Sequence, residues 1–496
     1  MSGFYIPDFK LLIPELILIF SALFLLMEGV FRKNKDPNLS RRFGQKAILA
    51  LIAALVVLVF QHTPGEKWVT FEGQIVQDDF IYFAKILILI GSAAVLAISL
   101  PKMGREQILF FEYSSLILLA TIGMLLMVEA NDFMSLFVGL EMQGLALYVL
   151  AAFKRDQILS SEAALKYFIL GALATSLYLY GSSLIYGFSG TTNFEILASV
   201  IRIESSEVLP VGMLVGLIFI MAALSFKVSA VPFHMWTPDV YQGCPTPITA
   251  FIAAAPKLAA MVVFLRLMVN PFIVLYGEWQ SIISFLSIAS MIVGAFAALR
   301  QTDIKRLLAY SAIGQMGYVL MGVAAGNDEG IQAVFVYLTI YLVMIVGTFG
   351  CILALRGKGH DDVQNIEDLS GISTLHPKIA FILAVFMFSL AGIPPLAGFF
   401  AKLYVFKAAI SAGLFSLAIV GALTSVVATY YYLKIVKVMY FDGIPELPAL
   451  SYGQTLVLSL EMKVVLNLCA IFILLFFVFP NPVLEMAQQA AFAILK

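Results

Sequence analysis

Four ionisable side chains lie deep inside apolar stretches of this sequence, where a charge is costly. Glu141 lies in LFVGLEMQGLALYVL, Lys227 in FIMAALSFKVSAVPF, Lys257 in PITAFIAAAPKLAAMVVF and Lys402 in SLAGIPPLAGFFAKLYVF. Ionisable groups within membrane helices are rare and mark ion or proton pathways. Lysine suits proton transfer because burial disfavours its charged form, whereas a nearby carboxylate favours it. These four residues therefore predict a buried proton path in which Glu141 modulates Lys227, and Lys257 and Lys402 carry the proton onward.

Structural roles are the alternative for some of these residues. A buried pair such as Lys227 with Glu141 can also hold two helices together, and Lys402 could extend its stem toward the surface. Lys257 directly follows Pro256 near the middle of its apolar stretch, too far from either interface for a lysine to reach. Lys257 is therefore the residue for which a functional role is most strongly indicated.

Other polar residues are candidates for supporting roles. His234, two residues after Pro232, could carry protons or cap backbone groups. Lys166 is a candidate at the cytoplasmic opening of the bundle, together with Glu112. Hydroxyl groups could hold the water that proton transfer needs, and the candidates are Ser225, Ser229, Thr249 and Ser389. Charges near the ends of apolar stretches are expected to snorkel or to cap helices; these are Glu15, Glu28, Lys85 and Lys407.

The composition predicts an α-helical membrane protein. The chain has 496 residues, of which 61% are hydrophobic and 12% charged, about half the charged fraction of a soluble domain. Apolar runs of about 20 residues can each cross the bilayer as a helix, because lipid leaves no other partner for the backbone. Fourteen spans are predicted, near residues 12–31, 45–61, 79–100, 107–128, 132–153, 161–188, 210–242, 245–269, 279–299, 304–324, 330–355, 378–410, 416–440 and 462–478.

Two of these spans are unusually long and contain prolines. The seventh (210–242) and the twelfth (378–410) each have 33 residues and are predicted to unwind in the middle. Spans four to eight and nine to thirteen then form two five-helix units that are inverted relative to each other, as in transporters with alternating access. The predicted divisions are 1–106, 107–269, 270–440 and 441–496, the last containing a loop and span fourteen.

The loops alternate in charge, which predicts the orientation. Basic loops, such as the one containing Arg41, Arg42 and Lys46, are expected to be cytoplasmic, which places both termini on the periplasmic side. The three cysteines have no CxxC spacing, and no phosphate-binding or dinucleotide-binding motif is present. The sequence therefore predicts no metal or cofactor site in this chain and no nucleic-acid partner.

Several stretches resemble the antiporter-like membrane subunits of respiratory complex I, a family related to multi-subunit cation/proton antiporters. They cover about residues 10–480 and include EAALKYFILGALATSLYLYG, FKVSAVPFHMWTPDVYQGCPTPITAFIAAAPKLA and IKRLLAYSAIGQMGYVLMG. The resemblance implies that Glu141 and Lys227 are the modulating pair, Lys257 the central carrier and Lys402 the exit residue. The resemblance is to the subunit N type for three reasons: a lysine at position 402, the amino-acid sequence around Lys257 and a short C-terminal region.

The resemblance also implies the setting of the chain. It implies a proton-translocating, non-redox subunit of NADH:quinone oxidoreductase in a bacterial inner membrane. FMN, iron–sulfur clusters and quinone would belong to partner subunits, and the neighbours would be antiporter-like subunit M, the small subunit K and lipid. A subunit of a stand-alone sodium/proton antiporter is the alternative.

Overall fold

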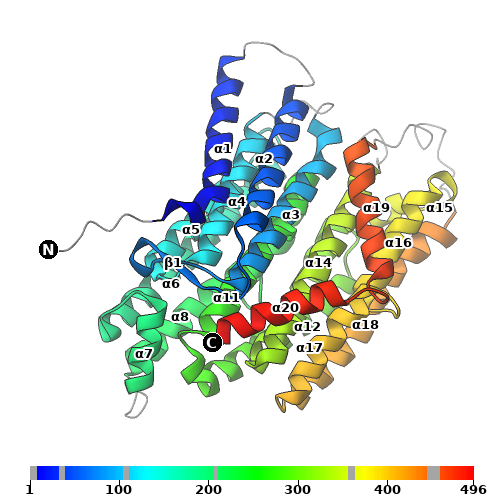
Figure 1. Ribbon diagram of the computed structural model, residues 1–496. Helices are drawn as coiled ribbons and strands as arrows, with labels where there is room; N and C mark the ends of the chain where they lie inside the picture. The colour runs from blue at the N-terminus through cyan, green and yellow to red at the C-terminus, as the bar shows by residue number, and fades with distance from the viewer. Residues whose placement is uncertain are drawn as a thin grey trace.

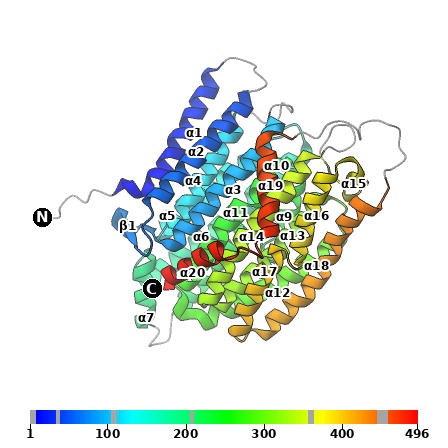
Figure 2. The same ribbon diagram turned by 45° about the vertical axis from the view of Figure 1, so that its right-hand side comes forward.

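The computed structural model describes residues 8–32, 39–103, 111–204, 210–355, 363–443 and 458–495. Within these ranges the chain is a bundle of helices packed side by side (Figures 1 and 2), as predicted. Twelve helical segments are long and apolar enough to cross a membrane. They are α1 (Ile13–Phe31) with a preceding 3-10 turn, α2 (Leu39–Gln61), α3 (Asp79–Met103), α4 (Glu112–Glu129), α5 (Phe133–Ala151), α6 (Ile158–Ser189), α8 (Val211–Val228), α10 and α11 (Thr246–Ala253 and Ala255–Val269), α12 (Tyr276–Leu299), α13 (Ile304–Ala325), α14 (Asp328–Ala354) and α18 (Phe415–Phe441).

Shorter helices occupy the other two predicted spans. The twelfth consists of α16 (Pro377–Ala391) and α17 (Ala397–Ser411), and the fourteenth corresponds to α19 (Leu460–Leu475). These three helices have 15, 15 and 16 residues and are shorter than any of the twelve segments above. The count of fourteen spans, like the division into inverted repeats, therefore stays a prediction.

Three spans are interrupted, one more than predicted. The seventh stops at Val228 and resumes as α9 (Trp236–Gly243), and the twelfth is broken between α16 and α17, both as expected. The eighth is also broken, at Ala254, whose backbone (φ −97°, ψ −102°) is not helical. Pro256 explains this break, because proline lacks an N–H donor and its ring crowds the residues before it. Lys257 therefore lies in the first turn of α11.

Helix starts are set by acidic side chains that accept backbone N–H groups. Asp132 accepts from the N–H groups of Met134 and Ser135 at the start of α5. Asp303 accepts from the N–H of Arg306 at 2.9 Å at the start of α13, where a helix start was predicted. Each cap satisfies donors that have no partner within the helix.

Smaller elements close one end of the bundle. Strands β1 (Trp68–Thr70) and β2 (Ile75–Gln77) form an antiparallel hairpin, and isolated bridges join Ile75 to Ala130 and Asp132 to Asn193. Two helices outside the predicted spans are α7 (Phe194–Glu204) and α20 (Asn481–Leu495). Figure 1 shows α20 lying across the bundle, where it packs on α3, α11 and α14.

Close backbone contact joins α12 and α13. A Cβ added at Gly294 would lie 2.5 Å from the backbone nitrogen of Gly314 and 2.8 Å from the carbonyl oxygen of Tyr310. A Cβ added at Gly314 would meet only ordinary contacts, the nearest at 3.8 Å. The close approach therefore depends on the missing side chain at position 294 alone.

These two glycines make a matched pair for a stability test. Gly294→Ala should cost about 1–3 kcal/mol, because backbone atoms cannot move away as the end of a side chain can. Gly314→Ala should be tolerated. The measurement is the temperature at which the purified, detergent-solubilised protein is lost from its size-exclusion peak. Equal midpoints for the two variants would contradict the predicted contact.

Candidate proton-translocation site

Lys257 is a buried amine with no hydrogen-bond partner. Its side chain is 1% exposed, and its Nζ has no partner among the described residues. The nearest aromatic rings are those of Tyr241, at 5.2 Å from Nζ to the centroid, and Trp236, at 5.9 Å. Ring faces attract an ammonium but accept no proton from it. The arrangement suits a group that alternates between ammonium and amine with the help of a transient partner such as water.

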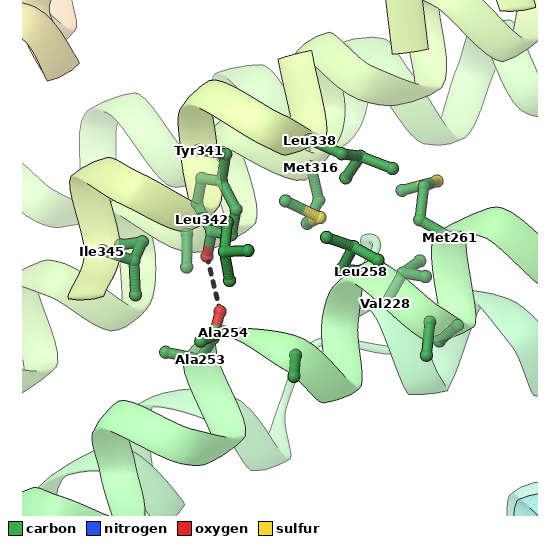
Figure 3. Packing of buried hydrophobic residues seen from close by; sticks show 14 of the residues in the cluster. Val228, Ala253, Ala254, Leu258, Met261, Met316, Leu338, Tyr341, Leu342 and Ile345 are labelled. Atoms are coloured by element: carbon green, nitrogen blue, oxygen red, sulfur yellow. Dashed lines mark hydrogen bonds between the residues drawn. The ribbon is translucent and has the colours of Figure 1, made fainter. Parts of the chain in front are cut away.

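The break beside Lys257 is stabilised from another helix. Figure 3 shows Tyr341 of α14 donating its hydroxyl to the carbonyl oxygen of Ala253, at 3.1 Å. Thr249 donates to the carbonyl oxygen of Tyr241 at 3.0 Å. The labelled side chains around this break in Figure 3 are otherwise apolar; they are Val228, Leu258, Met261, Met316, Leu338, Leu342 and Ile345. Apolar side chains of α13 and α14 therefore belong to the same hydrophobic core as Leu258 and Met261 of α11.

Glu141 and Lys227 share a small cavity but form no ion pair. Both line it, together with Thr175, whose hydroxyl donates to Glu141 Oε1 at 2.6 Å. Among the described residues, no carboxylate oxygen lies within the 4.0 Å ion-pair distance of Lys227 Nζ. Glu141 and Lys227, which were predicted to act as a pair, therefore line the same cavity without direct contact. The carboxylate of Glu141 accepts a hydrogen bond from Thr175 instead.

Aromatic rings connect Lys227 with Lys257. The Lys227 Nζ lies 6.0 Å from the ring of Tyr148, which is edge-on to the ring of Tyr167 at 4.9 Å. Tyr167 stacks on Trp236 with 4.5 Å between centroids, and Trp236 faces Lys257. The Tyr148 hydroxyl is buried without a hydrogen-bond partner among the described residues. This hydroxyl is a polar group next to Lys227 that sequence reasoning did not single out.

Lys402 is fixed by hydrogen bonds at the twelfth-span break. Its Nζ donates to the carbonyl oxygen of Ala391 at 3.0 Å and to Ser425 Oγ at 2.8 Å, and lies 5.1 Å from the ring of Tyr318. The side chain is 5% exposed. Snorkelling of Lys402 to the surface, the alternative considered from sequence, is therefore wrong.

A hydrogen-bonded network lies next to Lys402. The Tyr337 hydroxyl donates to Gln315 Oε1, and Gln315 Nε2 donates to the Tyr432 hydroxyl at 3.0 Å. Tyr432 in turn lies 2.5 Å from Ser311 Oγ, and the ring of Tyr337 stacks on that of Tyr318 at 6.5 Å. Sequence reasoning missed these residues because each is an isolated polar position in a mostly apolar helix. An isolated position belongs to no periodic pattern that would mark it in the sequence.

The predicted supporting residues divide into bonded and unbonded groups. His234 Nδ1 and Ser225 Oγ are buried without a partner among the described residues, which leaves both able to hold water. The other three hydroxyl candidates are already used: Ser229 bonds Thr237, Thr249 bonds backbone, and Ser389 accepts from the Gly398 N–H. Of the four predicted water-holding hydroxyls, only Ser225 is thus unbonded.

Lys166 lies apart from the buried lysines. Its Nζ is 2.7 Å from Asp239 Oδ2 and 2.7 Å from Glu162 Oε1, and the Lys166 side chain is 41% exposed. Arg306 binds the other oxygen of Asp239 at 2.9 Å. Asp239, which sequence reasoning missed, is therefore the centre of an ion-pair network joining α6, α9 and α13 near the bundle end.

Two charges predicted to snorkel are instead fully buried. Lys85 Nζ lies 2.8 Å from Glu15 Oε1 and 2.5 Å from Glu129 Oε2, with all three side chains at most 2% exposed. The predicted anchoring role of Glu15 and Lys85 is therefore wrong. Glu28 and Lys407, by contrast, form surface ion pairs, with Arg32 and Lys46 and with Glu329 respectively.

Broken membrane helices that carry buried ionisable residues are typical of membrane transport proteins. Residues 130–428 match the family model for the transmembrane domain of NADH:quinone oxidoreductase and Mrp antiporters. The chain belongs to this family. Among the described residues, no three His, Cys, Asp or Glu side chains are grouped to hold a metal ion.

Curated relatives specify the branch of the family. The chain is 52% identical to NADH-quinone oxidoreductase subunit N of Rhodospirillum rubrum, over 97% of this chain and 96% of that protein. It is 49% identical to subunit N of Parvibaculum lavamentivorans, over 99% of this chain and 98% of that protein. The resemblance stated from sequence to the subunit N type is thus confirmed.

Solved structures agree on the fold. A chain of respiratory complex I from Thermus thermophilus with bound aureothin superposes with a TM-score of 0.76 and 30% identity, covering 95% of this chain and 99% of that one. A chain of the Mrp complex from Dietzia superposes with a TM-score of 0.81 at 22% identity, covering 96% and 97%. At that identity the second match bears on the fold alone.

Gly392 provides a test of the position of Lys402. Its φ of +84° is left-handed, and an added Cβ would lie 3.0 Å from Lys402 Cδ and 3.2 Å from its Nζ. Gly392→Ala should therefore displace the lysine from Ala391 and lower proton pumping. Gly413→Ala is the matched control, because Gly413 has a similar φ of +77° but no neighbour within 4 Å of its Cβ.

Both variants carry the backbone strain of a left-handed alanine, about 1 kcal/mol or more. Only Gly392→Ala also disturbs the lysine. The measurement is NADH-driven quenching of a pH-sensitive dye in inverted membrane vesicles, normalised to the amount of assembled chain. Equal pumping by the two variants would show that the Lys402 position does not matter.

Proposed function

We propose that this chain is the proton-translocating subunit N of a bacterial NADH:quinone oxidoreductase, and that protons pass through Glu141, Lys227, Lys257 and Lys402. The observation that carries the proposal is Lys257, a buried amine at a helix break for which the described residues offer no hydrogen-bond partner. A structural lysine in lipid would be paired, because an unpaired buried charge is strongly unfavourable. A proton carrier must instead lose and regain its charge during each cycle.

The proposed mechanism begins at the Glu141–Lys227 cavity. When Glu141 moves toward Lys227 it stabilises the ammonium, and when it moves away the lysine releases its proton. The proton then crosses to Lys257, which gains an N–H bond as Lys227 loses one. Tyr148 Oη, Ser225 Oγ, His234 Nδ1 and Tyr241 Oη are among the polar groups of this region that have no hydrogen-bond partner within the described residues, and water held there supplies the intermediate positions.

Transfer from Lys257 to Lys402 forms the second step. Water must enter between the apolar side chains beside α11 for this step, and the Gln315 network, formed by residues of α13, α14 and α18, provides further polar groups. Lys402 receives the proton next to Ser425 and the carbonyl of Ala391, which stabilise its charged form. Lys166 and Asp239 form an ion pair at the bundle end and would lie beside the cytoplasmic opening, off the path.

Several features of the setting belong to this proposal. NADH oxidation would take place in partner subunits that hold FMN, iron–sulfur clusters and quinone, and the chain would act as their non-redox translocase. Subunits M and K would be membrane neighbours, both termini would face the periplasm, and 107–269 and 270–440 would be inverted repeats. The sodium/proton antiporter alternative is disfavoured, because relatives near 50% identity are named subunit N.

Substitutions at Lys257 test the proton-carrier role. Lys257→Met should lower NADH-driven proton pumping by about a hundredfold or more, in the range expected for losing a proton-transfer group. Lys257→Arg should also fail, although it keeps the charge, because arginine does not release its proton. Lys407→Met is the control, since Lys407 is a lysine with a 63% exposed side chain that pairs with Glu329 at the surface.

The readout is pumping per assembled complex in inverted vesicles. Unchanged pumping by Lys257→Met would rule out the proposed path. Full activity of Lys257→Arg would mean that a fixed charge, rather than a moving proton, is what the site requires.

Purification tests the proposed assembly separately. Isolation of the tagged chain in mild detergent should bring down quinone-reducing NADH oxidation that is sensitive to rotenone or piericidin, with flavin and iron–sulfur absorbance. Isolation with small hydrophobic subunits and no such absorbance would favour the antiporter instead.

A further inference from the structure

The Glu15–Lys85–Glu129 cluster contains two carboxylates and one amine in the bundle interior. Its members come from α1, α3 and α4, and none is more than 1% exposed. Lys85 donates a hydrogen bond to Glu129 Oε2 at 2.5 Å, whereas its 2.8 Å contact with Glu15 Oε1 is an ion-pair contact without hydrogen-bond geometry. The proposed proton path uses none of these residues.

Three carboxylate oxygens of the cluster lack a hydrogen-bond donor. Among the described residues, neither oxygen of Glu15 nor Oε1 of Glu129 has such a partner. Buried carboxylate oxygens are almost always hydrogen-bonded, and their desolvation is costly when they are not. Glu15 Oε2 and Glu129 Oε1, for which neither a hydrogen bond nor an ion-pair contact is present among the described residues, are therefore the second sign, besides the surplus of negative charge, that the cluster lacks a cation.

Arg266 forms no ion pair with the cluster, and its charge is shared among Asp78, Glu195 and Glu129. Arg266 of α11 donates to the carbonyl oxygen of Val128 at 2.7 Å and approaches Asn131 Oδ1 at 3.4 Å. Among the described residues, no carboxylate oxygen lies within 4.0 Å of its guanidinium. With both carboxylates ionised, the cluster itself would carry a net charge of minus one in a region where an uncompensated charge is strongly disfavoured.

We propose that the Glu15–Lys85–Glu129 cluster is a proton-binding site, separate from the lysine path, that holds one proton on Glu15. Glu129 keeps its charge because it receives the lysine hydrogen bond. A proton on Glu15 adds an O–H donor and leaves one ammonium opposite one carboxylate. In the binding step a hydronium ion gives its proton to a Glu15 oxygen, forming that O–H bond and releasing water.

An acidic cavity lies near this site, although none of the three cluster residues lines it. Arg266 lines this cavity together with Asp78, Asp79 and Glu195, and its guanidinium is bonded to the residue directly before Glu129. The acidic wall attracts protons from solution. Arg266, which is bonded next to Glu129, is nine residues beyond Lys257 on α11, about 13 Å along the helix axis. The proton-binding cluster is therefore distinct from the central lysine. The proposal does not depend on the proton path described above.

Infrared spectroscopy of the intact complex tests the proposal. Subtracting the spectrum of Glu15→Gln from that of the unmodified complex should reveal one carbonyl-stretch band of a protonated carboxylic acid, shifted in D₂O. Glu129→Gln should lose the same band, because Glu15 then ionises to remain the counter-charge of Lys85. Glu28→Gln is the matched control on the same helix, since Glu28 is ion-paired with Arg32 and Lys46, and it should lose no such band.

Assembly provides the second readout. Glu15→Gln replaces a neutral acid by a neutral amide of the same shape, so the amount of chain in the intact complex should stay within about twofold of normal. Lys85→Met should assemble poorly, and the Lys85→Met/Glu129→Gln double variant should recover. Retention of the band in Glu15→Gln, or failure of that variant to assemble, would overturn the proposal.

Discussion

An α-helix that stops inside a membrane leaves carbonyl oxygens that lipid cannot satisfy, and the three interrupted spans of this chain all meet that constraint with a side chain. Trp236 donates its indole N–H to Phe226 in the seventh span, Tyr341 donates to Ala253 in the eighth, and Lys402 donates to Ala391 in the twelfth. Only in the twelfth is the donor itself a residue of the proposed path. The breaks thus decide where the lysines lie and which of them is already bonded.

The two halves of the path differ in how completely their buried polar groups are hydrogen-bonded. Around Lys227 and Lys257, the hydroxyls of Tyr148, Ser225 and Tyr241 are buried and unbonded among the described residues. Around Lys402, Gln315 and the surrounding tyrosines satisfy one another. Buried polar groups without a hydrogen-bond partner can bind water, whereas a network whose members are all hydrogen-bonded is rigid. The first half is therefore suited to changing hydration, and the second to keeping a fixed arrangement.

Sequence reasoning recovered the helical class, the positions of the twelve long spans and two of the three breaks, because long apolar runs and prolines within them are strong local signals. It placed Lys257 and Lys402 correctly in the interior. It missed the break at Ala254, since that span has an ordinary length of 24 residues. It also misjudged Glu15 and Lys85: depth along a helix can be counted, but the facing carboxylate of Glu129 comes from a different span and becomes visible only in three dimensions.

Helix α20 has a consequence for how the chain is made. It lies over α3, α11 and α14, which belong to the beginning, middle and second half of the sequence, and it also contributes to the wall of the Arg266 cavity. A ribosome completes α20 after all three of its partners. The membrane-inserted chain must therefore hold these helices in place without their cover during translation, and the acidic cavity acquires its last wall only when synthesis reaches this helix.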